Sequence, residues 1–217
     1  MASTGAKFPT SGTSVLEAPY DDNAWTSPTN IYTNNVLYAQ ITALTFDAPK
    51  YSYVLYAKGF DFSGIPAGAT IDGVIVTIDA KSGSGIDSMM VVCQLTDTTG
   101  ARVGTNKNDN WYPGTTDGTR SYGGAADTWG NSLTESWVKD ADFGVGVVFQ
   151  ADDIDAKIYI DYITMEVYYT ASSALGKVNV GGVWKTVNKI QVNVGGVWKD
   201  VSSAKVNVGG AWKTLAS

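Results

Sequence analysis

Histidine is absent from the sequence of 217 residues, and Cys93 is its single cysteine. The absence of histidine excludes Ser-His-Asp and Cys-His catalysis, and it also excludes histidine-ligated zinc. One cysteine cannot form an intrachain disulfide bond. Because Cys93 lies in the apolar run at residues 89–93, we expect a small buried hydrophobic residue rather than a reactive thiol.

Charged residues and long apolar runs are also scarce. Only 17% of the residues are charged, and no run approaches the roughly 18 apolar residues that span a membrane. The first ten residues lack the basic and apolar regions of a signal peptide. We therefore expect synthesis in a cytoplasm, with no signal peptide and no membrane insertion.

Residues typical of strands and turns are plentiful instead. The chain contains 24 glycines, 12 tyrosines and 7 tryptophans, and 44% of its residues are hydrophobic. Aromatic residues favour strands, and glycine favours the turns between them. A hydrophobic fraction of this size is enough for a packed core, so the composition predicts a folded β protein.

Net charge divides the chain into two parts. Residues 1–170 carry 9 basic and 20 acidic side chains, whereas residues 171–217 carry 6 lysines and a single acid, Asp200. The acidic first part argues against nucleic-acid binding. The lysines of the second part recur at fixed spacing, so we expect them on solvated strand faces.

The second part contains an internal repeat. The segment Lys-Val-Asn-Val-Gly-Gly-Val-Trp-Lys begins at Lys177 and recurs with one change each from Gln191 and Lys205, a spacing of 14 residues both times. Alternating Val-Asn-Val, a Gly-Gly pair and a returning Val-Trp-Lys predict one β-hairpin per repeat. In the first hairpin we expect Asn179 opposite Trp184.

Each repeat contributes one tryptophan at an equivalent position, and these are Trp184, Trp198 and Trp212. A lone hairpin is marginally stable in water, and three hairpins make a thin layer with little interior. The three rings must therefore be covered by each other, by the first part of the chain or by other copies. We interpret them as packing and oligomer contacts, in preference to glycan-binding rings.

Strand periodicity runs through most of residues 15–170. One expected strand places Val74, Val76 and Ile78 on the same face. A longer strand places alternate residues on one face, and these are Tyr159, Ile163, Met165, Val167 and Tyr169.

We therefore predict an all-β fold, in which a jelly-roll-like antiparallel β-sandwich is followed by a small array of three β-hairpin repeats. One short helix is expected over residues 132–139, where Ser132 is placed to cap it and Glu135 follows three residues later. The predicted boundaries are residues 1–170 for the sandwich, with 1–14 as an extended arm, 171–176 for a linker and 177–217 for the repeats.

Residues 104–130 show no clear periodicity and are rich in aromatic side chains. Long segments of this kind often carry function, and aromatic rings combine apolar area with a polar edge that suits sugars. Trp111, Tyr112 and Tyr122 are therefore the candidate glycan contacts. For Trp129 we favour a structural role that closes one end of the sandwich.

Two acidic clusters, at residues 21–22 and 152–155, offer carboxylate oxygens of the kind that bind calcium. Neither has the spacing of an EF-hand loop, so we favour solvated turns and expect no metal and no cofactor. The many acidic residues do not exclude a glycosidase pair, but no spacing in the sequence identifies one. We therefore expect a protein that is not an enzyme.

Four further segments stand in an ordered series at residues 62–74, 122–130, 142–147 and 159–169. They begin with Phe-Ser-Gly-Ile-Pro-Ala-Gly, Tyr-Gly-Gly-Ala-Ala-Asp-Thr-Trp-Gly, Asp-Phe-Gly-Val-Gly-Val and Tyr-Ile-Asp-Tyr-Ile-Thr. In this order the chain resembles a β-sandwich module of minor virion proteins of tailed bacteriophages. The Val-Asn-Val-Gly-Gly-Val-Trp-Lys repeats are similar to short repeats near the C-termini of phage tail and fibre proteins.

The resemblance implies a non-enzymatic virion structural protein displayed on the particle surface, as a tail fibre or receptor-binding piece or as a capsid decoration. It implies other tail or capsid proteins as partners and makes host-surface glycans a candidate ligand. By analogy with phage fibres, we expect a homotrimer. A carbohydrate-binding module not tied to a virion is the alternative, and a polysaccharide hydrolase is a less favoured one.

Overall fold

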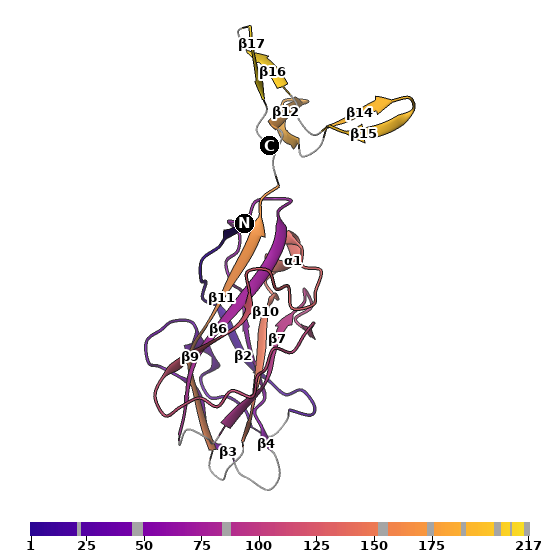
Figure 1. The fold of residues 1–217 in the computed structure, drawn as a ribbon. Coiled ribbons are helices and arrows are strands. Elements are labelled where there is room, and N and C mark those ends of the chain that lie inside the picture. Colours follow the sequence, from indigo (N-terminus) through magenta and orange to yellow (C-terminus); the bar gives the residue numbers. More distant parts are fainter. Residues whose placement is uncertain are drawn as a thin grey trace. The chain divides into compact units, whose positions relative to one another are not determined.

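The computed structural model describes residues 1–20, 23–44, 50–83, 88–151, 156–172, 176–187, 190–201, 205–208 and 210–214. The chain forms two compact units, Met1–Thr170 and Ala171–Ser217, which we call the body and the tail. Strands are the main regular structure of both units (Figure 1). The predicted all-β, sandwich-like fold is confirmed.

The first sheet of the body is built around its two longest strands, β6 (Thr70–Ser82) and β11 (Ala156–Thr170), which pair antiparallel along most of their length. Strand β6 also pairs with β9 (Gly118–Gly124), and β11 also pairs with β1 (Ala2–Ser3) and β3 (Ala39–Leu44). The Val and Ile residues of β6 and β11 favour this structure because branched side chains pack well on a pleated surface.

The second sheet has the order β2-β5-β10-β7-β8, and β4 pairs with β10 outside this path. Every pairing in this sheet is antiparallel, and most of them join strands that are distant in the sequence. The strands are β2 (Ser11–Val15), β4 (Lys50–Tyr51), β5 (Val54–Lys58), β7 (Ser88–Thr96), β8 (Arg102–Val103) and β10 (Gly144–Ala151).

The core of the body lies between the inner faces of the two sheets. Strand β6 contributes Val74, Val76 and Ile78, which are fully buried on one face as their alternation predicts. Val145 and Val147 of β10 belong to the same buried cluster and approach it from the other sheet. The two sheets are therefore held together by one continuous apolar interior.

Cys93 belongs to this interior, as the sequence predicts. It lies on β7 and is fully buried. Burial raises the pKa of its thiol well above the usual range, since the charged thiolate is disfavoured away from water. A buried thiol that stays protonated acts as a small hydrophobic residue.

Strand β11 contains a β-bulge at Asp161, where its register with β6 shifts. Ile160 is buried before the bulge, and Ile163 is buried after it. Tyr159 therefore lies on the opposite face and contacts the ring of Tyr38 edge to face. The prediction of one shared face is wrong for Tyr159, because a bulge moves the following side chains to the other side of the sheet.

The segment expected as an extended arm, residues 1–14, is extended but belongs to both sheets. Strand β1 pairs with the end of β11, and β2 lies at the edge of the second sheet. Between them, Lys7 and Met165 exchange two backbone hydrogen bonds of 2.8 and 3.0 Å. A side chain at Gly12 would collide with the carbonyl group of Pro28, so glycine is needed at this close approach.

The single α-helix of the described residues, α1 (Glu135–Val138), is shorter than predicted and has a different cap. The side chain of Thr134 accepts a hydrogen bond of 3.2 Å from the backbone N–H of Trp137. The prediction that Ser132 caps the helix is wrong, because Ser132 precedes the first turn by too many residues. Lys139 ion-pairs with Glu135 one turn away at 2.5 Å.

Each repeat of the tail folds as a separate two-stranded antiparallel sheet. The register places Asn179 opposite Trp184, as predicted, and the other two repeats match it. In the second repeat the two turn glycines have φ values of 64° and 85°, which fits the left-handed turn expected from Gly-Gly. The strands are β12 (Gly176–Val180), β13 (Val183–Val187), β14 (Gln191–Val194), β15 (Val197–Asp200), β16 (Lys205–Val208) and β17 (Ala211–Thr214).

Candidate functional site

The second hairpin, formed by β14 and β15, presents apolar side chains on both faces. Asn193 stands opposite Trp198, and Val194 stands opposite Val197. Because successive residues of a strand point to opposite faces, Trp198 lies on one face and the two valines lie on the other. Trp198 is 64% exposed and Val197 is 59% exposed. The hairpin therefore covers neither of its faces by itself.

The other hairpins repeat this arrangement in their backbone register. Trp184 and Trp212 occupy the positions that correspond to Trp198, and their side chains lie outside the described residues. Val183 corresponds to Val197 and is also exposed. The shared register makes each hairpin a candidate contact surface of the same kind.

The hairpin turn is stabilised locally by the asparagine of the repeat. In the second repeat, Oδ1 of Asn193 accepts a hydrogen bond of 2.9 Å from the backbone N–H of Gly196. Asparagine commonly closes turns through its side chain in this way. The hairpin therefore obtains its shape from its own residues, which leaves its faces available for contact.

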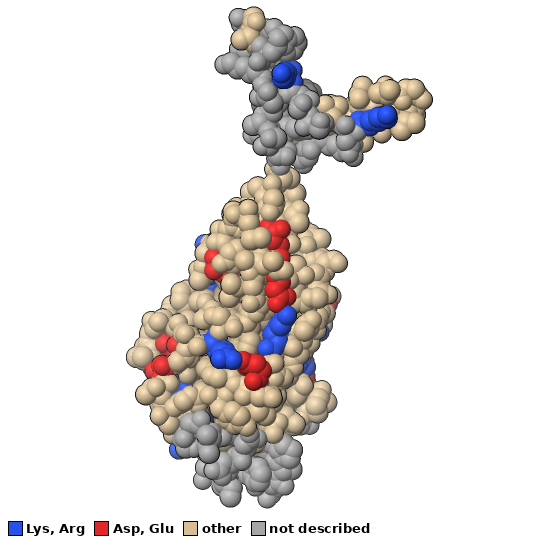
Figure 2. Space-filling model, in the orientation of Figure 1, with Lys and Arg blue, Asp and Glu red and all other residues tan. Residues whose placement is uncertain are grey.

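Charge differs between the two units. Figure 2 shows Asp and Glu beside Lys and Arg on the body, whereas the described charged side chains visible on the tail are lysines. On the second hairpin, Lys199 stands opposite Val192, on the face that carries the valines. A contact on this face must therefore accommodate a cation beside the apolar groups.

The three aromatic residues predicted to contact glycans do not share one exposed surface. Trp111 is partly buried against the core, whereas Tyr112 is exposed. Tyr122 is buried, and its hydroxyl donates a hydrogen bond of 3.1 Å to Asp109. Burial and the negative charge of Asp109 raise the pKa of Tyr122 above its usual value. Tyr112 therefore offers the most ring area to a sugar, and Tyr122 offers almost none.

Tyr122 is buried because it lies on a strand, although the sequence of this strand has no alternating apolar pattern. Strand β9 has the sequence Gly-Thr-Arg-Ser-Tyr-Gly-Gly, and Tyr122 is its single large apolar residue. A strand without alternating apolar residues gives no periodic signal. Its register with β6 places Tyr122 beside Val76, a residue of the core. One tyrosine among small and polar residues was the available sign of this strand.

Trp129 has the structural role that we favoured from the sequence. Its ring is fully buried, and its Nε1 donates a hydrogen bond of 2.9 Å to the carbonyl oxygen of Val74. The backbone of Trp129 has a φ of 58°, in the left-handed region that bulky residues rarely adopt. The buried ring and its hydrogen bond hold the chain in this conformation.

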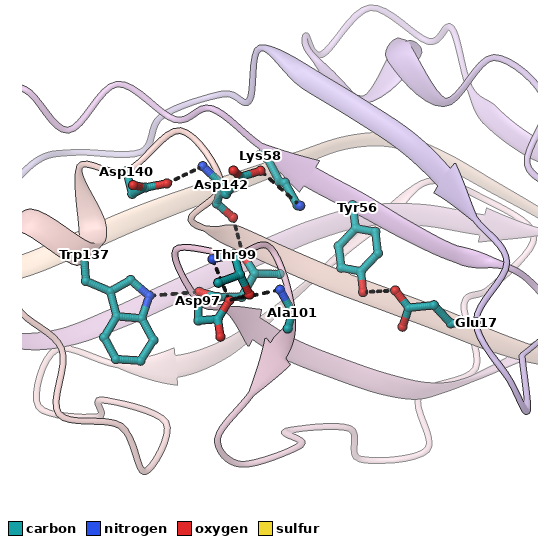
Figure 3. A network of polar contacts seen from close by, with 10 residues as sticks. Glu17, Tyr56, Lys58, Asp97, Thr99, Ala101, Trp137, Asp140 and Asp142 are labelled. Atoms are coloured by element: carbon teal, nitrogen blue, oxygen red, sulfur yellow. Dashed lines mark hydrogen bonds and ion pairs between the residues drawn. The ribbon is translucent and has the colours of Figure 1, made fainter.

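A group of charged and aromatic side chains joins β5 to the segment after β2, and Figure 3 shows Tyr56 and Glu17 of this group. The hydroxyl of Tyr56 donates a hydrogen bond of 2.5 Å to Glu17. Arg102 ion-pairs with the other oxygen of the same carboxylate at 3.0 Å and lies 5.0 Å from the centre of the Tyr20 ring. Burial and the bond to Glu17 raise the pKa of Tyr56 above its usual range. These contacts attach residues 17–20 to the sheet.

A second polar group lies at the ends of β5, β7 and β10 (Figure 3). Lys58 ion-pairs with Asp142 at 3.4 Å, and the Thr96 hydroxyl donates to the carbonyl oxygen of Asp142 at 2.7 Å. Asp97 accepts hydrogen bonds of 2.8 and 2.7 Å from the backbone N–H and the hydroxyl of Thr99. The bonds from Thr99 lower the pKa of Asp97. The carboxylates of this group therefore serve as turn acceptors and ion-pair partners.

Among the described residues, Asp79 alone has a buried side-chain oxygen without a hydrogen-bond partner. The residue is only 8% exposed on β6. Burial raises the pKa of its carboxyl group, and the negative charges of Asp117 and Asp161 raise it further. The ionised form of Asp79 is therefore unfavourable in the folded protein.

In the part of the chain that the structure describes, no group of three or more His, Cys, Asp and Glu side chains is arranged to hold a metal ion. The acidic clusters at 21–22 and 152–155 lie outside the described residues. No helix among the described residues has the length and apolar character needed to cross a membrane.

A pocket of about 330 Å³ opens on the body between the N-terminal segment and the loop that follows Phe60. Polar side chains line most of it, and one tyrosine near the end of β11 completes its wall. The lining residues that carry hydroxyl or charged groups are Ser3, Thr4, Lys7, Asp61, Ser63 and Tyr169.

No model of a known protein family matches the chain, and no curated protein matches it. The tail hairpins, the exposed Tyr112 and the pocket of the body are therefore the features from which a function can be inferred.

Proposed function

We propose that this protein is a non-enzymatic structural component of a tailed bacteriophage particle. It is displayed on the particle surface as a tail fibre or receptor-binding piece, or as a capsid decoration. The observation that carries the proposal is the exposure of Trp198 and Val197 on opposite faces of one hairpin. Exposed apolar groups on a repeated hairpin that covers neither of its faces favour a role in assembly. The resemblance of the ordered motifs at residues 62–74, 122–130, 142–147 and 159–169 to minor virion proteins supports the particle as the setting.

Assembly is favoured because it removes apolar surface from water. Burying a side chain such as valine or leucine completely contributes roughly 1.5–3 kcal/mol, and association costs about 4–15 kcal/mol. The free energy gained by partly burying a few side chains on each hairpin, summed over the tail, is of the same order as the free energy cost of association. The exposed apolar residues of the second hairpin are Val192, Val194, Val197 and Trp198.

The proposed assembly is a homotrimer around a symmetry axis. Closed cyclic symmetry gives every copy the same environment, which suits identical hairpins. The number of copies follows the analogy with phage fibres. Other tail or capsid proteins are then the partners at the attachment point, and the protein is located in the virion after synthesis in the host cytoplasm.

Light scattering on the purified full-length protein tests the assembly. We expect three times the chain mass of 23.0 kDa. Replacing the three tail tryptophans with serine (Trp184→Ser, Trp198→Ser, Trp212→Ser) should shift the mass toward that of one chain. Tyr112→Ser removes an exposed ring from the body and should leave the trimer intact. A wild-type protein with the mass of one chain contradicts the proposal.

Electron microscopy of intact particles tests the setting. An antibody raised against the body should label a defined position on the head or on the tail. Particles that lack the protein after purification would contradict a virion role. The position of the label decides between a capsid decoration and a tail component.

A carbohydrate-binding module is the second candidate function, and the exposed ring of Tyr112 favours it. Aromatic rings at protein surfaces offer apolar area to the faces of sugar rings. A glycan array tests this function, and Tyr112→Ala should abolish the signal. Retained binding by this variant excludes Tyr112 as the contact. Turnover of a surface polysaccharide would instead indicate a hydrolase.

A further inference from the structure

We propose that the pocket of the body binds a single neutral sugar residue. Its volume of about 330 Å³ lies at the lower end of the range for small-molecule sites. That size suits one monosaccharide ring rather than an extended oligosaccharide. The site belongs to the body alone and does not depend on assembly through the tail.

The lining of the pocket matches a ligand rich in hydroxyl groups. Among the lining hydroxyls, that of Thr4 already donates to the carbonyl oxygen of Gly5 at 2.9 Å and accepts from the N–H of Val167. That of Ser63 bonds to Asp61, so Ser3 carries the hydroxyl whose hydrogen is left to donate to a ligand. Lys7 adds a donor, and Asp61 adds an acceptor. Each hydroxyl of a sugar is also both a donor and an acceptor, so a mixed lining of this kind can satisfy several of them.

The charges of the pocket favour a neutral ligand over an anionic one. Lys7 is the single cation among the lining residues, and Asp61 faces the same space. The positive charge of Lys7 contributes to lowering the pKa of Asp61, after the hydrogen bonds from Ser63. Asp61 is therefore ionised at neutral pH, and it would repel a phosphate or a sugar acid.

The pocket also has the apolar surface that a sugar face requires. Tyr169 is partly buried against the core and forms part of the wall. Phe62 is buried beneath the pocket, where it stacks on Phe60 and contacts Phe143 edge to face. Because Phe62 is only 1% exposed, Tyr169 is the ring that can meet the C–H face of a sugar, and Phe62 supports the floor of the pocket from within the core.

The walls are fixed before a ligand enters. The backbone N–H of Thr4 donates to the carbonyl oxygen of Val167 at 3.0 Å, and the N–H of Val167 donates to the Thr4 hydroxyl at 3.0 Å. On the other side, Asp61 accepts a hydrogen bond of 3.0 Å from the backbone N–H of Ser63. A preformed site loses little conformational entropy on binding, which favours affinity.

Titration of the full-length, isotope-labelled protein by NMR tests the proposal, with glucose, galactose, mannose and N-acetylglucosamine as probes. At least one probe should cause saturable shifts confined to residues 3–7, 61–64 and 169. A dissociation constant on the order of millimolar is expected for a ligand of this size. Absence of a saturable shift at these residues with every probe overturns the proposal. Shifts confined to residues 111–122 overturn it as well and support the Tyr112 surface instead.

A pair of glycine variants identifies the site. A Cβ atom at Gly64, on the rim of the pocket, would meet no atom within 4 Å, so Gly64→Leu can fill the opening without disturbing the fold. Gly114 lies outside the pocket, and the nearest atom to a Cβ there is 4.0 Å away. Gly64→Leu should weaken binding by about tenfold or more, and Gly114→Leu should leave it unchanged. Equal binding by Gly64→Leu and the wild type overturns the assignment.

A charge variant tests the role of the carboxylate. Asp61→Asn keeps an oxygen that can accept from Ser63 but weakens the acceptor offered to a sugar hydroxyl, so affinity should fall several-fold. Unchanged affinity in this variant contradicts the part assigned to Asp61. Sugar binding by a monomeric protein would contradict the proposed assembly and leave this site intact, so the two proposals fail separately.

Discussion

Trp129 holds its backbone in a conformation that favours glycine, and its buried ring explains why. The ring lies within the core, and Nε1 bonds to the carbonyl oxygen of Val74. Trp129→Ala should lower the free energy of unfolding by about 3–5 kcal/mol, because it leaves a large cavity. Urea denaturation measures this loss.

Trp129→Phe is the matched control for this prediction. It keeps a buried ring but leaves the carbonyl oxygen of Val74 without its partner, which costs about 1–3 kcal/mol. The phenylalanine variant should therefore lie between the wild type and the alanine variant. An alanine variant as stable as the wild type would contradict the role assigned to the ring.

The raised pKa of the buried Asp79 carboxyl group predicts that the stability of the fold depends on pH. The pKa of this group is raised in the folded protein, so its ionisation destabilises the fold fully above that pKa, and this cost is lost progressively as the pH falls through the folded pKa toward the ordinary value of 3.8. Asp79→Asn removes the charge and should raise the free energy of unfolding at neutral pH, by on the order of 1 kcal/mol. Thermal melts should show this gain at pH 7 and a smaller one in acid.

Asp142→Asn serves as the control for Asp79→Asn. Asp142 is paired with Lys58, so loss of its charge should leave stability unchanged or lower it. A gain of the same size in both variants would attribute the effect to net charge rather than to the burial of Asp79.

At the scale of single elements, helix α1 depends on its cap. Thr134 accepts the N–H of Trp137 in a helix of only four residues. Thr134→Ala should lower the free energy of unfolding by about 1 kcal/mol, whereas Thr134→Ser keeps the oxygen and should lower it less. Chemical denaturation compares the two variants. Equal losses in both would indicate that the methyl group, and not the hydroxyl, matters.

The elements also differ in how well the sequence predicts them. The tail hairpins follow from residues close together in the chain, so Asn179 and Trp184 could be paired from spacing alone. The bulge at Asp161 depends on the fit between β11 and its partner β6, which the sequence of one strand does not contain. Strand β9 forms because β6 offers it an edge, although its own residues give little strand signal.

At the scale of the whole molecule, the candidate sites also divide into those set by residues close in sequence and those set by distant residues. The sequence identifies the tail hairpins as contact surfaces, since their repeat is local. It does not identify the pocket, because Lys7, Asp61 and Tyr169 come from three distant segments that only the fold brings together. Tyr112 and Tyr122 lie close in sequence, yet one is exposed and the other is buried.

Charge distribution predicts how salt affects assembly of the whole molecule. Each tail carries 6 lysines and one acid, so tails that meet in an oligomer repel one another. The screening length falls from about 10 Å at 0.1 M salt to about 3 Å at 1 M, which weakens this repulsion. Sedimentation analysis should therefore show several-fold tighter association at the higher salt concentration.

Lys199→Gln tests the source of this effect, because Lys199 shares a face with the exposed valines. The variant should associate more tightly than the wild type in dilute salt and respond less to added salt. Weaker association at high salt would instead indicate that the basic tail of one copy contacts the acidic body of another.

The independence of the hairpins has a consequence for how such a chain can vary. Each repeat pairs its two strands with each other, so we expect a duplication or deletion of 14 residues to keep the strand pairing of the body and of the remaining hairpins. In the proposed assembly, such an event changes the number of contact surfaces that each chain carries. Each added or lost repeat can therefore raise or lower the overall strength of binding between assembled copies, without a compensating mutation elsewhere in the chain.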